Sequence, residues 1–412
     1  MIGWTGNVGF NQYNERWKRI RRWYQQRLVA KSSAINYHPL QYRQVRRLLH
    51  GILQNPEDYA YQLKRHAAGI LFEVSYGDTV MSLSDHQVIR STEDSIRDCL
   101  VGSSFGSALV DFCPIMQHLP AWMPGMSFKY ITEKARRAIV QMESLPYNAV
   151  KNAIEDGTAK PSLTTDLIRE CSTKGELSAK DERDIMGAAG ALYSGGADTS
   201  LTTMIVFILV MVQHPAIFRT AQEEITRVVG DSRLPDFGDR ESLPYLECII
   251  REVYRWCPGL TTGVPHQAAE DDIYRGYFIP KGSTVIANLW AIFRDPNMYP
   301  EPNVFRPERF LDADRDDTFD LKDPKKLVFG FGRRICPGRY FADDTVWLAA
   351  ACIIATMDIG KARDEHGKEI LPTPKFISGA VMRPEPFVCD IQPRSERSRR
   401  LILDSAAEVW AI

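Results

Sequence analysis

The chain has 412 residues, a formal net charge of −1, 44% hydrophobic residues and 25% charged residues. This composition is ordinary for a soluble globular protein, and the near-neutral balance argues against a nucleic-acid-binding role. The eight cysteines form no CxxC pair or repeated spacing, which favours reduced thiols over a disulfide framework or a zinc site.

Helical patterns occupy most of the chain. Residues 14–54 form a basic stretch with apolar side chains on one helical stripe. Ser178 and Asp181 match a capping box that opens a long helix, and Pro215 should end that helix. Another helix is predicted over residues 244–257.

A small β part is predicted at residues 273–287, where apolar residues flank a turn at 280–282 in the pattern of a β-hairpin. The apolar run at residues 204–212 is too short to cross a bilayer, so no transmembrane segment is predicted. Residues 394–412 form a basic stretch and a short apolar tail, expected to be a solvated appendage. The simplest organisation is one mainly helical domain, residues 1–393, followed by this tail.

One segment carries the strongest chemical signal. Residues 329–338 read Phe-Gly-Phe-Gly-Arg-Arg-Ile-Cys-Pro-Gly, the pattern F-x-x-G-x-R-x-C-x-G. The glycines let the backbone turn tightly and approach a flat ligand. Cys336 can present a thiolate to a metal, and Arg334 can meet an anionic group beside it. The alternative is a buried cysteine in a glycine-rich turn.

This segment resembles the haem-binding loop of the cytochrome P-450 superfamily. The resemblance implies the fold of that family, mainly α with a small β part, and haem b as the cofactor. It implies that Cys336 is the axial ligand of the haem iron, with Phe329 and Gly338 in the cofactor-binding loop and Arg334 at a haem propionate.

Glu252 and Arg255 lie three residues apart on the helix predicted at 244–257, so they share one face. Such pairs are usually surface ion pairs worth well under about 1 kcal/mol, but the surrounding helix is largely apolar. In the family, a P-x-R-F element brings its arginine to this E-x-x-R pair, and residues 307–310 match that element. The resemblance therefore implies a buried, structural ion network of Glu252, Arg255 and Arg309.

Residues 195–200 read Gly-Gly-Ala-Asp-Thr-Ser within the predicted long helix. Two glycines inside a helix cost about 1 kcal/mol each, so the pattern indicates a close backbone approach or a local distortion. A polar kink is the alternative. The hexad resembles the oxygen-activation element of the family, which implies that Asp198 and Thr199 relay protons through water as catalytic residues.

Trp17 and Arg21 form a W-x-x-x-R pair on the predicted basic helix, which by itself could be only an amphipathic surface helix. The resemblance implies that both residues hold a haem propionate. His266 follows Val264-Pro265 where the family places another propionate donor, and an exposed loop histidine is the alternative.

A basic rim is expected on the thiolate side of the haem, where an acidic flavin domain could deliver electrons. A solvated face is the alternative, since runs of charge usually have no partner. The rim is predicted to contain Lys18, Arg19, Arg22, Lys325, Lys326, Arg333 and Arg339.

Together these motifs predict a haem-thiolate monooxygenase of the fungal secondary-metabolism type. It should insert one oxygen atom of O2 into a small apolar substrate, such as a terpenoid, polyketide, indole or aromatic xenobiotic. The chain carries no dinucleotide fingerprint, so electrons should come from NADPH through a separate NADPH–cytochrome P-450 reductase. The alternatives are a reductase-independent isomerase or dehydratase, and an inactive haem-binding fragment.

The resemblance covers residues from about 3 to 393, and family members usually carry further helices and strands before the W-x-x-x-R motif. The sequence therefore predicts an N-terminally truncated P-450 fold with an open edge at the hairpin of residues 273–287. Lower stability or aggregation is expected relative to an extended chain. The family places such enzymes on the cytoplasmic face of the endoplasmic reticulum. This chain shows no anchor, could be cytoplasmic and is expected to be a monomer.

Overall fold

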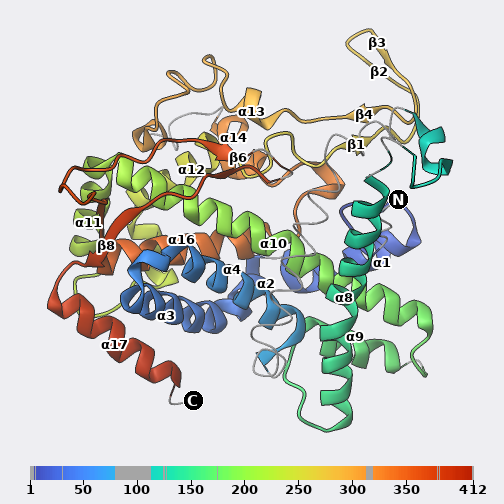
Figure 1. The fold of residues 1–412 in the computed structure, drawn as a ribbon, viewed down its shortest axis with the longest axis horizontal. Coiled ribbons are helices and arrows are strands. Elements are labelled where there is room, and N and C mark those ends of the chain that lie inside the picture. The colour runs from blue at the N-terminus through green and yellow to red at the C-terminus, as the bar shows by residue number, and fades with distance from the viewer. Residues whose placement is uncertain are drawn as a thin grey trace. The chain divides into compact units, whose positions relative to one another are not determined.

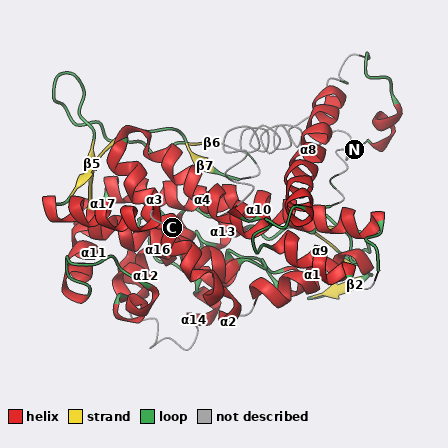
Figure 2. Cartoon of the chain, turned by 90° about the horizontal axis from the view of Figure 1, so that it is seen from below, coloured by secondary structure: helices red, strands yellow, loops and turns green. Residues whose placement is uncertain are grey.

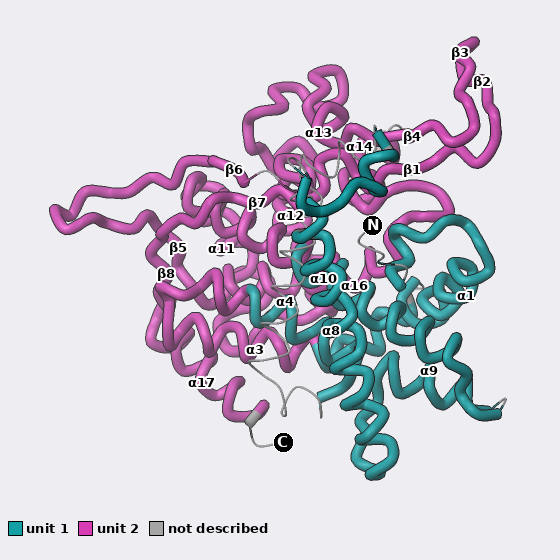
Figure 3. The backbone as a smooth tube through the Cα atoms, turned by 45° about the vertical axis from the view of Figure 1, so that its right-hand side comes forward, with its two compact units in different colours: residues 1–40, 64–198 teal, residues 41–63, 199–412 magenta. Residues whose placement is uncertain are grey.

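The computed structural model describes residues 4–78, 113–311 and 319–410, apart from positions 5, 30, 124, 125, 127, 174, 378 and 380. Helices predominate in this part of the chain and the strands are short (Figures 1 and 2). The prediction of a mainly α fold with a small β part is confirmed. The chain divides into two compact units, which Figure 3 colours separately. Unit 1 is Met1–Leu40 with Lys64–Asp198, and unit 2 is Gln41–Leu63 with Thr199–Ile412.

The described part of unit 1 is helical. Its elements are α1 Glu15–Tyr24, η1 Gln25–Val29, α2 Lys31–Ala34, η2 Ile35–Tyr37, η4 Pro114–His118, α8 Phe128–Glu155 and α9 Leu163–Ser172, with parts of α3 His38–Gln54, α4 Tyr59–Tyr76 and α10 Ala179–Gln213. Asn14 caps α1 by accepting a hydrogen bond from the Trp17 N–H at 2.9 Å. The predicted apolar stripe of α1 is buried, and the Tyr24 hydroxyl donates to Ala188 O of α10 at 2.5 Å.

The long helix α10 begins at the predicted capping box. The Ser178 hydroxyl accepts from the Asp181 N–H, and the Asp181 carboxylate accepts from the Ser178 N–H, both at 3.1 Å. This prediction is confirmed. The helix ends at Gln213, just before Pro215 opens α11 Pro215–Val228. By length and composition α10 could cross a membrane, yet 67% of its most apolar window is buried within the protein, as in the core helices of soluble proteins.

Unit 2 holds the remaining helices. In chain order after α11 they are η5 Phe237–Ser242, α12 Pro244–Trp256, α13 Leu289–Ile292, η6 Pro307–Phe310, α14 Phe319–Lys322, α15 Pro324–Leu327, η8 Gly332–Arg334, α16 Arg339–Thr356 and α17 Glu396–Trp410, with η3 Pro56–Asp58 near the start of the chain. Helix α12 is amphipathic and contacts η5, η6, α11, α15 and α16. Most of α16 is buried, including Trp347.

The described strands of unit 2 form four two-stranded antiparallel sheets. The pairs are β1 His266–Gln267 with β4 Thr284–Val285, β2 Asp272–Tyr274 with β3 Tyr277–Ile279, β5 Met357–Lys361 with β8 Cys389–Pro393, and β6 Phe376–Ile377 with β7 Arg383–Pro384. The sequence predicted a hairpin with its turn at residues 280–282, and the position of that turn is wrong. The chain reverses at Arg275 and Gly276, whose φ angles of 50° and 84° suit a two-residue hairpin loop. Consequently β3 pairs with β2, and β4 pairs with β1.

Residues of the C-terminal stretch pack against the rest of unit 2. Helix α17 contacts α16 and β8, and Ile402 and Ala406 on its inner face are buried. The expectation of a solvated appendage is therefore wrong, because the apolar residues recur at helical spacing and the basic residues occupy the other face. The boundary between a catalytic domain and a tail at residue 393 stays a prediction.

Replacing Ile402 by alanine should destabilise the protein by about 2–5 kcal/mol, because the substitution leaves a cavity at a fully buried position. The matched control is Leu401→Ala, which truncates a half-exposed neighbour on the same helix and should cost less. Urea unfolding followed by circular dichroism measures both losses. Equal losses in the two variants would show that α17 is not anchored through Ile402.

Candidate functional site

Cys336 lies in a tight loop that joins α15 to α16 in unit 2. Its backbone N–H donates to Phe329 O at 2.8 Å and so closes the loop on itself. Gly330 and Gly332 have φ angles of 81° and 59°, a left-handed conformation that favours glycine. Helix α16 starts at Arg339, directly after this loop. The positive, N-terminal end of the α16 dipole is therefore only a few residues from the cysteine along the chain.

One side of the loop is open. A side chain at Gly330, Gly332 or Gly338 would meet no atom of the described residues within 4 Å beyond its chain neighbours. Cys336 itself is half-buried. A half-buried thiol on a glycine-lined loop fits a flat ligand that approaches the backbone and binds sulfur.

Three buried cysteines suit this role less well. The seven cysteines in the described part of the chain form no disulfide. Burial raises the pKa of Cys248 and Cys257 to about 12, and it raises the pKa of Cys352 further. These three thiols therefore stay protonated at neutral pH and are poor metal ligands.

The segment that leads into the loop is anchored in the core of unit 2. Leu327 and Val328 pack against an apolar cluster formed by Cys248, Leu289, Phe293, Tyr299 and Phe310. Phe329 meets Tyr254 of α12 edge to face, with ring centroids 5.6 Å apart. The loop thus starts from a fixed position on α12.

Glu252 and Arg255 form a fully buried ion pair on α12, with both side chains 0% exposed. Arg255 Nε and Nη2 donate to the two Glu252 carboxylate oxygens at 2.6 and 2.8 Å. Arg255 Nη1 also donates to Phe293 O and Pro302 O at 2.8 and 2.7 Å. The bidentate pair therefore fixes two backbone segments that precede the Cys336 loop.

Arg309 of η6 completes this network. Its Nε lies 3.1 Å from the nearer Glu252 oxygen, and its Nη1 donates to Pro300 O at 2.8 Å. Burial lowers the pKa of Arg309, and the charge of Glu252 offsets part of that effect. The structure therefore brings together all three residues that the E-x-x-R and P-x-R-F motifs singled out.

The glycine pair in α10 lies in a more exposed window of an otherwise buried helix. Gly195 is exposed, Asp198 and Thr199 are half-buried, and the helix continues unbroken through them. A Cβ at Gly196 would lie 2.6 Å from Leu71 Cδ1 of α4, so this glycine permits close packing within unit 1. A Cβ at Gly195 would meet no described atom within 4 Å beyond its own helix and neighbours.

The predicted propionate donors lie on several separate elements. Trp17 and Arg21 lie one turn apart on the buried face of α1 in unit 1. In unit 2, His266 is a half-buried residue of β1 opposite Val285, and Arg334 belongs to η8. Burial lowers the pKa of the Arg334 guanidinium.

Three segments that are distant in sequence meet within unit 2. The Met382 N–H donates to Gly259 O at 2.8 Å. A Cβ at Gly259 would lie 3.7 Å from Val381 Cγ1 and 3.9 Å from Thr202 Cγ2. The end of α12, the segment after β6 and the turn of α10 that follows Thr199 are therefore neighbours.

Two residues of the predicted basic rim are bound internally instead. Lys325 is 14% exposed and contacts Glu247 and Asp343, while Arg19 contacts Asp181 and Asp184. These partners come from other helices, and the local run of charges does not reveal them.

Sequence reasoning also missed the polar face of α12 that receives Lys325. Glu247, Arg251 and Tyr254 recur at positions i, i+4 and i+7 of α12, which was an available signal.

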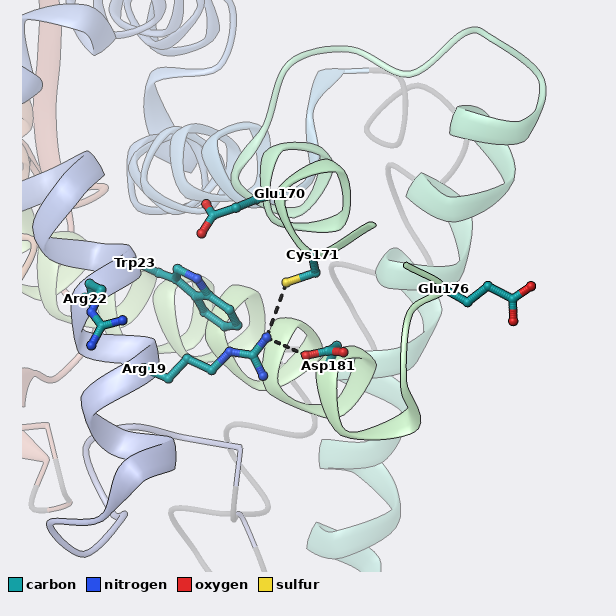
Figure 4. A pocket seen from close by; sticks show the side chains of 7 residues that line it. All are labelled: Arg19, Arg22, Trp23, Glu170, Cys171, Glu176 and Asp181. Carbon is teal, nitrogen blue, oxygen red and sulfur yellow. Dashed lines mark hydrogen bonds and ion pairs between the residues drawn. The ribbon is translucent and has the colours of Figure 1, made fainter. Parts of the chain in front are cut away.

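A hollow of about 180 Å³ lies in unit 1 between α1, α9 and the start of α10 (Figure 4). It is lined by Arg19, Arg22, Trp23, Glu170, Cys171, Glu176 and Asp181. Arg19 Nη2 donates to Cys171 Sγ at 3.3 Å and also contacts Asp181, so its charge is already compensated. The hollow contains none of the residues that the motifs singled out.

Comparison with known proteins decides the family. The sequence profile described as "Cytochrome P450" (here written P-450) matches residues 3–390. The chain belongs to the cytochrome P-450 family. It is 45% identical over 402 residues to cytochrome P-450 monooxygenase 176 of Postia placenta, covering 98% of this chain and 77% of that protein. It is 37% identical to cytochrome P-450 monooxygenase claR of Ampulloclitocybe clavipes, covering 98% and 74%.

The fold agrees with this assignment. A solved structure of a zebrafish cytochrome P-450 with progesterone superposes with a TM-score of 0.74 at 22% identity, covering 94% of this chain and 85% of that one. Curated P-450 monooxygenases align over nearly the whole chain, which makes it a P-450 monooxygenase. Membership of the family implies a haem cofactor, a small-molecule substrate and a redox partner.

Removing Arg309 should destabilise the protein by about 3–5 kcal/mol, because Arg309→Ala leaves the buried Glu252 carboxylate without part of its compensation. The control is Arg306→Ala, whose side chain is 38% exposed and pairs with the exposed Glu301. That surface pair should contribute no more than about 1 kcal/mol. Guanidinium unfolding of both variants gives the comparison, and a loss in Arg309→Ala as small as in the control would refute a structural role for the network.

Proposed function

We propose that this chain is a haem-thiolate monooxygenase in which Cys336 supplies the sulfur ligand. The observation that supports this most is the open, glycine-lined side of the loop that carries a half-buried Cys336. The fold and the fungal P-450 relatives support the same reaction class.

When bound, haem b supplies the iron that activates O2. The chain's own contribution begins with Cys336 Sγ, which would supply the sulfur ligand and whose thiolate the N-terminal end of α16 favours. Burial lowers the pKa of the Arg334 guanidinium, and an anionic propionate beside it would favour the charged form. His266 is the second proposed donor on unit 2. Trp17 and Arg21 stay predictions from the motif on unit 1.

Insertion of one oxygen atom of O2 releases the other as water, which consumes two electrons and two protons. NADPH would supply the electrons through a separate flavoprotein reductase. Asp198 is the proposed proton source, and the Thr199 hydroxyl is proposed to pass protons on through water. Both residues are only half-buried in this window of α10, which supports this role.

The proposed substrate is a small apolar molecule of the terpenoid, polyketide, indole or aromatic type. The meeting of Gly259, Val381 and Thr202 supports a substrate-binding region bordered by these segments, close in sequence to Thr199. The named relatives come from fungi, which supports a role in fungal secondary metabolism or xenobiotic oxidation. We further propose a monomer on the cytoplasmic face of the endoplasmic reticulum.

Replacing Cys336 by serine should abolish the red-shifted Soret band of the ferrous, carbon monoxide-bound protein, because an alcohol cannot replace the thiolate as a strong donor to iron. The matched control, Cys389→Ser, changes another half-buried cysteine of unit 2 and should keep the band. Absorbance spectra of both purified variants give the answer. A thiolate-type band that survives in Cys336→Ser would reject the ligand assignment.

Thr199→Ala should lower the yield of oxygenated product per NADPH by at least about tenfold, since loss of a positioned proton donor typically costs 10²–10⁴ in rate. NADPH oxidation should continue, with its electrons and protons converting O2 to hydrogen peroxide. The control is Thr203→Val, which removes the hydroxyl that donates to Thr199 O at 3.0 Å. Product and peroxide are quantified with reductase present, and unchanged coupling in Thr199→Ala would contradict the relay.

A further inference from the structure

We propose that a second ion cluster, formed by Arg240, Glu247, Lys325 and Asp343, positions the Cys336 loop for binding metal through sulfur. This proposal rests on the proposed function. The cluster is separate from the Glu252 network, although Glu247 also lies on α12. Lys325 precedes the loop in the chain and Asp343 follows it, so the cluster can hold both ends of the loop against one helix.

The four side chains form a closed set of contacts. Lys325 Nζ lies 2.9 Å from Asp343 Oδ1 and also contacts Glu247. Arg240 Nη2 lies 3.2 Å from Glu247 Oε2 and also contacts Asp343. Each cation therefore meets both anions, and all four side chains are between 14% and 21% exposed. Fixing the side chains of such a network costs less conformational entropy per ion pair than fixing those of isolated surface pairs.

Neighbouring groups extend the cluster within unit 2. Arg240 Nη1 lies 2.7 Å from Asp344 Oδ1, and its guanidinium lies over the Trp347 ring at 5.4 Å from the centroid. Arg251 lies 3.6 Å from Asp323, the residue that caps α15. The start of α16, η5, α12 and α15 are thus joined through one set of charges.

The electrostatics indicate strong mutual stabilisation. Burial alone would raise the pKa of Asp343, but Lys325 and Arg240 outweigh it and lower that pKa to about 2. Glu247 follows the same pattern, because Lys325 opposes the effect of burial and leaves its pKa lowered. Both carboxylates are therefore charged over the whole neutral range.

Helix α12 connects the cluster to the cysteine loop. Burial raises the pKa of the Tyr254 hydroxyl, and the neighbouring Asp343 carboxylate raises it further. The ring of the same tyrosine contacts Phe329, whose carbonyl accepts the Cys336 N–H. Glu247 and Tyr254 lie two turns apart on α12, so the helix that carries Glu247 of the cluster also contacts the loop through Phe329.

The test compares two adjacent lysines. Lys325→Met removes the clustered charge, whereas Lys326→Met removes a charge that is 51% exposed and pairs with the exposed Asp320. Lys325→Arg keeps the charge and serves as the conservative rescue. Should Lys325→Met fail to fold, Glu247→Gln tests the same cluster with nearly unchanged side-chain volume.

Two readouts separate this proposal from the proposed function. The first is hydrogen exchange of the Cys336 amide, which needs no bound haem. We expect exchange at least about tenfold faster in Lys325→Met than in the parent chain, because the loop opens locally more often. Exchange in Lys326→Met should be unchanged, and Lys325→Arg should restore most of the protection.

The second readout is the share of haem-loaded protein that shows the thiolate-type Soret band with carbon monoxide. This share should fall at least about twofold in Lys325→Met at equal haem content and recover in Lys325→Arg. Equal Cys336 exchange in Lys325→Met and Lys326→Met would overturn the positioning role. If the parent chain itself lacks the thiolate band, the proposed function fails, and the exchange comparison still decides whether the cluster holds the loop.

Discussion

Helix α12 carries buried charges that residues of neighbouring elements must neutralise. The contacts that do so position much of unit 2. Glu252 is fully buried, so its carboxylate stays ionised only beside the positive charges of Arg255 and Arg309. Those arginines in turn bind backbone carbonyls at Phe293, Pro302 and Pro300, which places the irregular segment between α13 and η6. A buried network of this kind adds little net stability when complete, yet losing one member is costly. The network stabilises one arrangement of these loops relative to the others.

The Cys336 loop needs such external support because its own backbone offers little. Two of its glycines adopt left-handed conformations, and glycine loses more conformational freedom on folding than other residues. Inside the loop, the hydrogen bond from the Cys336 N–H to Phe329 O joins its two ends. The apolar cluster beneath Leu327 and Val328 fixes the approach to the loop, and the Tyr254 ring fixes Phe329. The loop glycines leave open space that suits a flat cofactor, and the contacts of Leu327, Val328 and Phe329 hold the loop in place.

Sequence predicted best where local rules dominate. The capping box at Ser178, the end of α10 before Pro215 and the extent of α12 all follow from short-range spacing, and the structure agrees. The hairpin turn was misplaced because residues 280–283 also form a turn, in which the Ser283 N–H donates to Pro280 O, but this turn joins two strands that do not pair with each other. Lys325 was assigned to a solvent-facing rim because its partners, Glu247 and Asp343, come from α12 and α16. Contacts between distant segments leave no local signature, so tertiary structure had to reveal them. The pairing of Glu252 with Arg309 was the exception, since the family resemblance supplied the long-range information.

The two charged groups of α12 differ in what they can control. The Glu252 network binds carbonyl oxygens of the segment that precedes the loop, so its loss should release much of unit 2 and lower global stability. The cluster of Arg240, Glu247, Lys325 and Asp343 lies closer to solvent and joins α15, before the loop, to α16, after it. Its loss should act mainly on local opening, because α12 and α16 keep their apolar packing. One helix can therefore serve both purposes: one set of charges specifies the fold, and the other is proposed to restrain the loop that carries Cys336.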